Sequence, residues 1–439
     1  MKTIYVSDIL TNMDLVDVSL SCWLRARRKC GGVLFLDVAD STGMVQCVVE
    51  RGSVSNGELF NTARHVAVES AIEITGTVIS TASRPREIIV KSLRVIDEAV
   101  LHISPQPRSA FDIFDPLLAE HLLTNRHLYL RNPKVMAILR FRGVLMSRTR
   151  TWFEKEHFME FDAPILTTIP LYDNDSAMGI DIHGRHAFLT QCVGFYLEAA
   201  VHAFERVYNM GPSFRGEESR SKRHLMEYHH IKAEIAFADL EDIIGIVESL
   251  IAYVTNTCKD ECGDILKTLG TQMCVDGAKI PFERISYEDA VVYLQSKGFD
   301  MVFGKGLGSS EEAELSTLFS GPFWVTGIPR VVEPFPYSID QKNPQLARVA
   351  DLIASNGFGE LLGVAEKIHN LEMLDTRLAE KGKSGDSRYN WIREVHMMGC
   401  VPHAAFGMGV ERLIRWLLNI PHVRDAIPFP RIFRRAVTP

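Results

Sequence analysis

The stretch Gly407-Met408-Gly409-Val410-Glu411-Arg412-Leu413 joins two glycines to what reads as the start of a helix. Glycines let a backbone approach a flat ligand closely, because they carry no side chain. Arg412 falls on the first turn of that helix, where unpaired backbone N–H groups favour a bound phosphate. A single glycine motif of this kind is weak evidence, so its meaning depends on the rest of the chain.

A second segment upstream also points to phosphate. Phe214-Arg215-Gly216-Glu217 leads into a polar loop, and the chain then returns through residues 223–227 to a predicted strand. A guanidinium that leaves a strand beside such a loop can neutralise a phosphate held against the sheet. Taken alone, the same residues would also fit a solvated hairpin tip.

A third segment precedes both. Residues 135–157 predict a long amphipathic helix, and a strand follows that ends at Pro164. In this order the three segments resemble motifs 1, 2 and 3 of the class II aminoacyl-tRNA synthetases. Further stretches resemble the aspartyl/asparaginyl/lysyl subclass, namely 130–133, 223–225, 401–403 and 424–431, and the last two are especially similar to asparaginyl enzymes.

The resemblance implies an enzyme that uses ATP and Mg²⁺ to activate a carboxylic acid as an adenylate. The acid attacks the α-phosphorus directly, so no protein nucleophile is required. The catalytic residues would be Arg215 at the α-phosphate, Glu217 at the adenine edge and Arg412 at the γ-phosphate. Arg223, His224, Glu360 and Gly409 would complete the ATP site, and Asp351 with Glu360 would bind magnesium through carboxylate oxygens.

The predicted architecture is α+β. Residues 1–100 show five short alternating strands with a helix over 56–66, which predicts an OB-fold barrel for anticodon or tRNA binding. Residues 101–132 read as a linker, and 133–439 as the class II catalytic domain, a mixed or antiparallel sheet flanked by helices. The stretch 262–320 is an insertion to which the sequence assigns no role.

In the barrel, Phe35 and Gln46 match the positions with which the subclass stacks on and reads an anticodon base, and Arg28 belongs to a local basic cluster. The alternative for Phe35 is a core aromatic residue. The resemblance also implies a homodimer whose interface is formed by motif 1.

The acid pocket departs from the subclass. The subclass places an acidic residue at position 232, where it receives the substrate's α-ammonium, and this chain has Lys232. Lys367 stands in place of an arginine that grips the substrate side chain, and Leu197 in place of a lysine. The expected pocket comprises Gln191, Gly194, Leu197, Lys232, Lys367, His403, Asp173 and Asp175.

Three interpretations of Lys232 stay open. The alignment within motif 2 could be displaced, or Glu234, Asp173 or Asp175 could neutralise the lysine. Otherwise the chain is a paralogue that activates an acid with a displaced or missing amino group, because two cations about 4 Å apart repel by roughly 1 kcal/mol in water and by more in a drier pocket. We favour the paralogue.

Composition sets outer limits on function. The chain has 439 residues, 46% of them hydrophobic and 23% charged, with a net charge of −7, as in a soluble protein of two or three domains. No stretch approaches the roughly 20 apolar residues that span a bilayer. The eight cysteines lack disulfide or zinc-site spacing. We therefore expect a cytoplasmic protein with reduced thiols and no membrane association.

Three functions are compatible with these observations. The first is a ligase that charges tRNA with asparagine, aspartate or an unusual relative. The second is a paralogue that adenylates a non-standard acid and passes it to ammonia, an amine or a protein. The third is a catalytically silent RNA-binding or regulatory protein, which the retention of Arg215, Asp351 and Arg412 disfavours.

Overall fold

The computed structural model describes residues 1–52, 57–81, 84–169, 176–219, 221–274 and 279–435. The chain divides into two compact units, residues 1–111 and 112–439. Among the described residues, no helix is long and apolar enough to cross a membrane.

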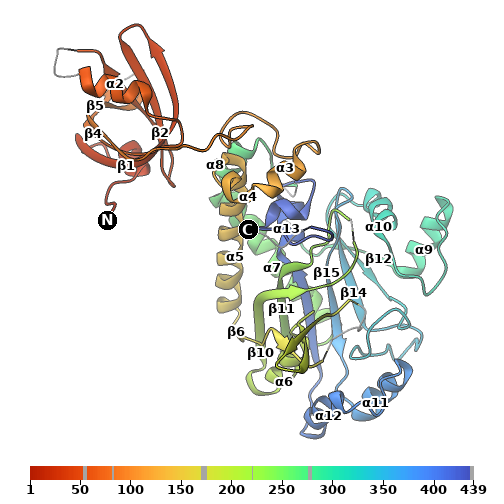
Figure 1. Cartoon of the computed structure of the whole chain (residues 1–439). Helices are drawn as coiled ribbons and strands as arrows, with labels where there is room; N and C mark the ends of the chain where they lie inside the picture. Colours follow the sequence, from red (N-terminus) through yellow and green to blue (C-terminus); the bar gives the residue numbers. More distant parts are fainter. Residues whose placement is uncertain (53–56, 82–83, 170–175, 220, 275–278, 436–439) are drawn as a thin grey trace. The chain divides into compact units, whose positions relative to one another are not determined.

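The first unit is the predicted OB-type barrel (Figure 1). Its five strands close in the order β1-β2-β3-β5-β4. Alternate side chains of β1 and β2 are buried, and these residues line the barrel core. The bounds are α1 Val6–Thr11, β1 Asp17–Cys30, β2 Val33–Ala39, β3 Met44–Glu50, α2 Gly57–His65, β4 Ala71–Thr81 and β5 Arg84–Asp97. The predicted strands and the predicted helix are all present.

The second unit is built on an eight-stranded sheet with the order β12-β13-β14-β15-β16-β11-β10-β6. Most neighbouring strands are antiparallel, and β12–β13 and β10–β6 are parallel. The predicted mixed sheet is thus confirmed. The strands are β6 Met159–Glu160, β10 Arg206–Phe214, β11 Glu227–Ala236, β12 Glu283–Ser286, β13 Phe323–Thr326, β14 Val349–Ala354, β15 Gly359–Lys367 and β16 His403–Gly409.

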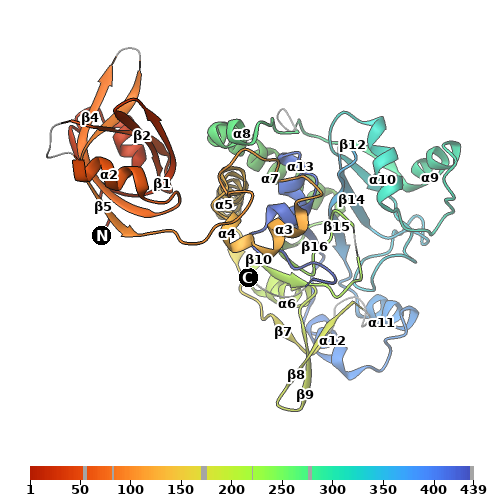
Figure 2. The same cartoon turned by 45° about the horizontal axis from the view of Figure 1, so that its top comes forward.

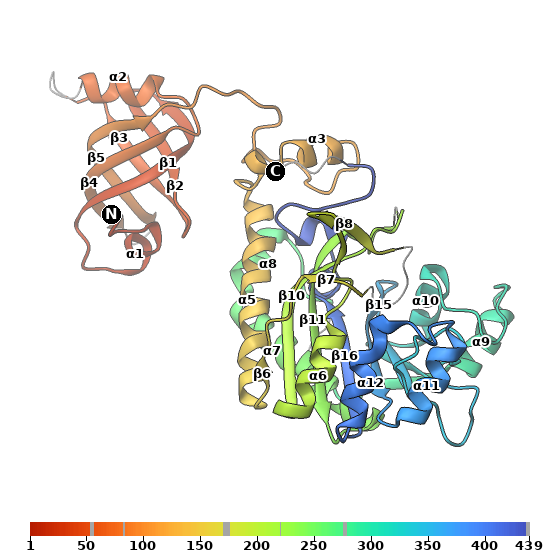
Figure 3. The ribbon, with the colours of Figure 1, turned by 60° about the horizontal axis from the view of Figure 1, so that its bottom comes forward.

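Two long helices pack together beside this sheet, α5 (Pro133–Lys155) and α7 (Leu240–Glu261) (Figure 3). Asn132 begins α5 by accepting hydrogen bonds from the N–H groups of Lys134 and Val135, and Pro133 occupies the first helical position. Phe153 of α5 stacks on Tyr208 of β10, with ring centroids 4.0 Å apart. This contact defines the helix-covered face of the sheet.

The remaining elements surround the sheet. They are α3 Ala119–Thr124, α4 Arg126–Tyr129, β7 Leu166–Thr167, β8 Met178–Ile182, β9 Arg185–Leu189, α6 Gly194–Phe204, α8 Gly263–Leu269, α9 Tyr287–Ser296, α10 Ser309–Leu315, α11 Leu371–Glu380, α12 Asn390–Met397 and α13 Val410–Leu417. Strands β7, β9 and β8 form a separate small sheet, and the β8–β9 hairpin extends away from the main sheet (Figure 2).

Two details of the predicted domain organisation differ from the structure, namely the extent of the linker and the nature of residues 262–320. The linker over 101–132 is too long, because residues 112–132 belong to the second unit and carry α3 and α4. Arg126 is buried and donates hydrogen bonds to the carbonyls of Pro428 and Ile427, which ties this segment to the end of the chain. The region 262–320 is no separate insertion, because its strand β12 extends the main sheet beside β13.

Candidate functional site

The register of the sheet arranges the site. Tyr208, Ala233 and Phe406 are paired in register across β10, β11 and β16, and Phe153 of α5 packs on the first and last of them. Because side chains alternate along a strand, the neighbouring position, Lys232, points to the opposite face. That face carries the cavities described below.

A row of paired residues crosses this second face. Lys232 on β11 pairs with Gly407 on β16, which pairs with Gly363 on β15, which pairs with Asp351 on β14. Strands lie about 4.8 Å apart, so the two charged residues stand about 14 Å apart. Two glycines between them leave an open floor on which a flat ligand can lie.

One end of this floor opens into a cavity of about 120 Å³. Among its lining residues are six that the sequence assigned to ATP: Arg215, Glu217, His224, Glu360, Gly409 and Arg412. The guanidinium of Arg412 lies 3.1 Å from Glu360 Oε2, and that of Arg215 lies over the ring of Tyr228. Two arginines that line one cavity together with aromatic rings suit a nucleoside triphosphate.

Arg223 does not line this cavity. Its guanidinium is ion-paired with the buried Glu312, whose carboxylate also accepts a hydrogen bond of 2.8 Å from the Glu360 N–H. Arg223 therefore holds the start of β15 in place. No sequence motif pointed to Glu312, or to Tyr228 and Phe433, the aromatic residues that line the nucleotide cavity.

Carboxylates gather in a second cavity of about 340 Å³, which shares Arg215, Glu217, His230, Glu360 and Gly407 with the first. Asp351, Glu360 and Glu333 all line it. Burial, Glu360 and Glu333 raise the pKa of Asp351 well above its usual value. Burial and Glu360 raise that of Glu333 to about 7. A cluster of partly buried, mutually repelling carboxylates fits a divalent cation. Glu333 had not been predicted.

The other end of the second cavity is the expected acid pocket. Gln191 and Lys232 line it, together with Ser176 and Tyr337. A Cβ built on Gly194 would lie 3.4 Å from Lys232 Cε, so the lysine side chain passes over this glycine. Burial opposes the charge of Lys232, yet its surroundings, Cys192 and Tyr337 foremost, hold its pKa above the usual lysine value.

Lys367 lies behind the pocket and does not line it. Its Nζ is 3.0 Å from Glu198 Oε2 and 3.7 Å from Glu234 Oε1, and all three side chains are buried. Leu197 packs in an apolar cluster with Val193, so its assignment to the pocket was wrong. The adjacent helix position, Glu198, is the residue that reaches this site.

Three further predicted positions are not found lining the pocket. His403 is fully buried and lines neither cavity. Asp173 and Asp175 lie outside the described residues.

On the barrel, Phe35 points outward, because Leu34 and Leu36 on either side of it are the core residues. Gln46 pairs with Asp37, and Arg28 pairs with Phe35. The Arg28 guanidinium donates a hydrogen bond of 2.9 Å to Gln46 Oε1. The three residues therefore share one outer face of the barrel.

Comparisons with known proteins agree with this geometry. Residues 119–432 match the profile of the class II tRNA synthetases (D, K and N), and residues 18–96 match that of the OB-fold nucleic acid binding domain. The chain belongs to the class II tRNA synthetases. It is thus an aminoacyl-tRNA ligase by family, a type of enzyme that forms an aminoacyl adenylate and charges tRNA.

The similar proteins extend over nearly the whole synthetase. The asparagine–tRNA ligase of Pelotomaculum thermopropionicum is 37% identical over 95% of this chain and 96% of its own length. The asparagine–tRNA ligase of Thermococcus kodakarensis is 35% identical over 98% of this chain and 97% of its own length. The structure of asparaginyl-tRNA synthetase from Pyrococcus horikoshii complexed with asparaginyl-adenylate has a TM-score of 0.90 at 32% identity and covers 99% of both chains.

Proposed function

We propose that this synthetase adenylates a carboxylic acid that presents an oxygen, rather than an α-ammonium, to Lys232. One observation carries the proposal. The Lys232 side chain is 5% exposed and lines the cavity, and no ion pair or hydrogen bond joins its ammonium to any residue that the structure describes. A carboxylate, hydroxyl or carbonyl oxygen of the substrate would supply the missing acceptor.

Compensation of Lys232 within the protein has less support. Glu234 follows two positions later on the same strand, but the cation that it approaches is Lys367, at 3.7 Å. Glu234 also carries the charge less readily, because burial raises its pKa to about 8. Gly194 has no side chain, which leaves the space that the Lys232 side chain occupies. The pocket is thus arranged around a cation.

The nucleotide half retains what adenylation requires. Arg215 and Arg412 would bind the phosphates of ATP, and the aromatic rings of Tyr228 and Phe433 would face its base. Asp351 and Glu360, with Glu333 beside them, would hold Mg²⁺, which neutralises phosphate charge when bound. The protein's contribution is to align the substrate carboxylate with the α-phosphorus and to exclude water. This set of residues weighs against a silent regulatory protein.

The acceptor that we propose is tRNA. Phe35, Arg28 and Gln46 lie together on one outer face of the barrel. An aromatic ring beside a cation and an amide is the combination with which such barrels stack on and hold single-stranded bases. Transfer to ammonia, an amine or a protein is the second candidate, and nothing specific in the geometry favours it. A homodimer through motif 1 is part of the same proposal.

ATP–pyrophosphate exchange tests the substrate proposal with matched acids. Asparagine and aspartate are each compared with the analogue in which hydrogen, hydroxyl or oxo replaces the α-amino group, so that one substituent varies. We expect exchange with an oxygen-bearing analogue to exceed exchange with its parent. If asparagine and aspartate support exchange as fast as, or faster than, their oxygen-bearing analogues, the substrate proposal is disproved. β-Amino and N-modified acids complete the panel, and ATP binding without any exchange would favour the silent alternative.

A further inference from the structure

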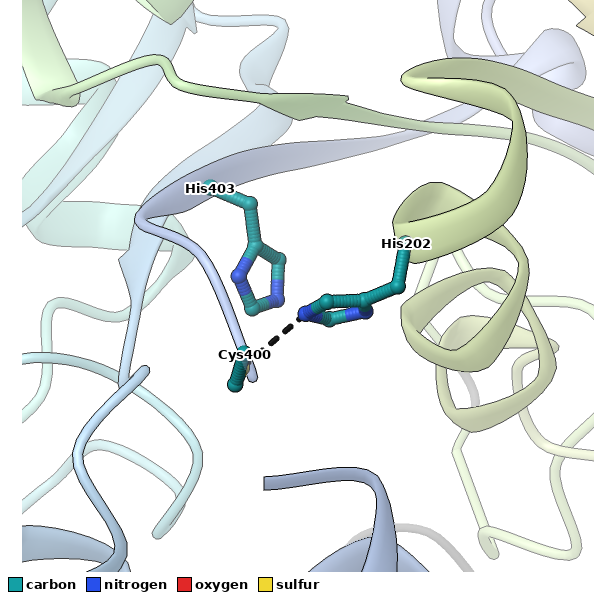
Figure 4. Close-up of side chains that lie close together, drawn as sticks. All are labelled: His202, Cys400 and His403. Atoms are coloured by element: carbon teal, nitrogen blue, oxygen red, sulfur yellow. Dashed lines mark hydrogen bonds between the residues drawn. The ribbon is translucent and has the colours of Figure 1, made fainter. Parts of the chain in front are cut away.

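Three potential metal ligands meet at a place that neither cavity includes. His202 lies near the end of α6, His403 begins β16, and Cys400 lies in the loop before that strand (Figure 4). One potential ligand atom from each residue lies within 4.8 Å of the others. Cys400 Sγ is 3.0 Å from His202 Nε2. No other group of three or more histidine, cysteine or acidic residues with such spacing occurs in the part of the chain that the structure describes.

Both imidazole rings are already oriented as metal ligands are. Nδ1 of His202 lies 2.7 Å from the carbonyl oxygen of Glu198, and Nδ1 of His403 lies 2.9 Å from that of Val401. A carbonyl oxygen accepts only, so each Nδ1 carries the proton and each Nε2 presents a lone pair. A backbone carbonyl on the far ring nitrogen is the usual support of a histidine bound to zinc.

His403 supplies a second, independent observation. Its side chain is fully buried, and its Nε2 has no hydrogen-bond partner. A buried acceptor without a donor costs free energy, so it calls for a ligand. His202 Nε2 differs, because it accepts hydrogen bonds from the Cys400 thiol and, at 3.3 Å, from the Val401 N–H.

We propose that His202, Cys400 and His403 bind a thiophilic divalent cation, zinc being the best match to two imidazoles and one thiolate. Binding would convert the thiol to a thiolate and release its proton to solvent. The cation would replace the weak contact between Cys400 and His202 and satisfy His403. Since His202 and Cys400 are only partly buried, a water molecule can fill a fourth position.

The position of the cluster gives the site a structural role. The carbonyl that orients His202 belongs to Glu198, whose carboxylate holds Lys367. A metal here would therefore join the end of α6 to the start of β16, directly behind the acid pocket. The two catalytic cavities and their carboxylates are elsewhere, so this cation would be distinct from magnesium.

Cobalt(II) is the probe for the test. The full-length protein is stripped with a chelator and titrated with Co²⁺ under anaerobic conditions while the absorption spectrum is recorded. We expect a thiolate-to-cobalt charge-transfer band and the strong visible bands of a four-coordinate site, which saturate at one equivalent per chain and disappear when Zn²⁺ is added. Cobalt bound at the carboxylate cluster would give no thiolate band.

Variants assign the band to these residues. Cys400→Ser should abolish it and His202→Gln should weaken it, whereas Cys274→Ser, a partly buried thiol elsewhere, should leave it unchanged. Zinc should raise the melting temperature of the stripped wild type but not of Cys400→Ser, and melting without metal shows whether that variant is folded. A wild type without the band, or a folded Cys400→Ser that retains it, would overturn the proposal.

Discussion

Lys367 Nζ lies 3.0 Å from Glu198 Oε2, and both side chains are almost completely buried. Glu234 approaches the same ammonium at 3.7 Å. The charge of Lys367 is thus engaged inside the protein and is not directed at the substrate. A position that the resemblance assigns to substrate binding is here a buried ion pair.

Replacing Lys367 with Met should destabilise the protein by about 3–5 kcal/mol, because Glu198 and Glu234 would lose their cation. Urea unfolding measures the loss. The double variant Lys367→Met, Glu198→Met should recover most of it, since both charges of the pair are then absent. Lys342→Met removes an exposed lysine and is the matched control. A loss below about 1 kcal/mol for the single variant would contradict the ion-pair role.

The proposed magnesium site, with Glu333 beside it, should bind the cation in a pH-dependent way. The pKa of Glu333 is raised to about 7, so the carboxyl is largely protonated below that pH and ionised above it. Only the ionised form attracts a cation. The Mg²⁺ concentration for half-maximal pyrophosphate exchange should therefore fall as the pH rises from about 6 to about 8. Glu333→Gln should flatten this dependence, and the exposed Glu241→Gln should not. An unchanged profile in Glu333→Gln would remove Glu333 from the metal site.

The sequence predicted the parts of the site that depend on motif chemistry. Arg215, Glu217 and Arg412 lie together at the nucleotide cavity because the first two follow β10 within three residues and Arg412 lies in the first turn of α13. Asp351 and Glu360 also lie together, on the paired strands β14 and β15.

Residues that act through long-range contacts escaped prediction. Glu198 was missed because the resemblance pointed to the neighbouring position, Leu197, and successive helix residues point about 100° apart. Glu312 and Glu333 precede the proposed metal ligands by many positions and carry no motif. The linker was overestimated because the short helices α3 and α4 gain their stability from packing, as Arg126 shows, and not from propensity.

Phe35→Ala should weaken tRNA binding without changing amino-acid activation. Loss of one stacked base costs about 1–3 kcal/mol, which corresponds to roughly 5- to 150-fold in affinity. Filter binding measures the affinity, and pyrophosphate exchange without tRNA serves as the activity control. Trp23→Ala removes an exposed aromatic residue elsewhere on the same barrel and should have little effect. Equal tRNA affinity in Phe35→Ala and the wild type would exclude this face.

One chain has a mass of 49.4 kDa, and the proposed homodimer predicts twice that mass in solution. Strand β6 ends the main sheet, and Met159 on it is 45% exposed, so a second copy can pair there. Met159→Asp should shift the mass found by light scattering toward the monomer. The exposed Met398→Asp provides the control. A wild-type monomer over the working concentration range would exclude the dimer.

Lys232→Glu should reverse the preference for the group at the substrate's α-position. Two like charges about 4 Å apart repel by about 1 kcal/mol in water and about 4 kcal/mol at the effective dielectric constant near protein surfaces. Changing the sign at 232 should therefore raise the ratio of kcat/KM for asparagine to that for its hydroxy analogue by at least about tenfold. Lys232→Met separates the removal of repulsion from the gain of attraction, and its ratio should be intermediate. Because Glu234 is already engaged by Lys367, the new carboxylate at 232 would be the group available to an ammonium. If the ratio is the same in the wild type and both variants, Lys232 does not select the substrate.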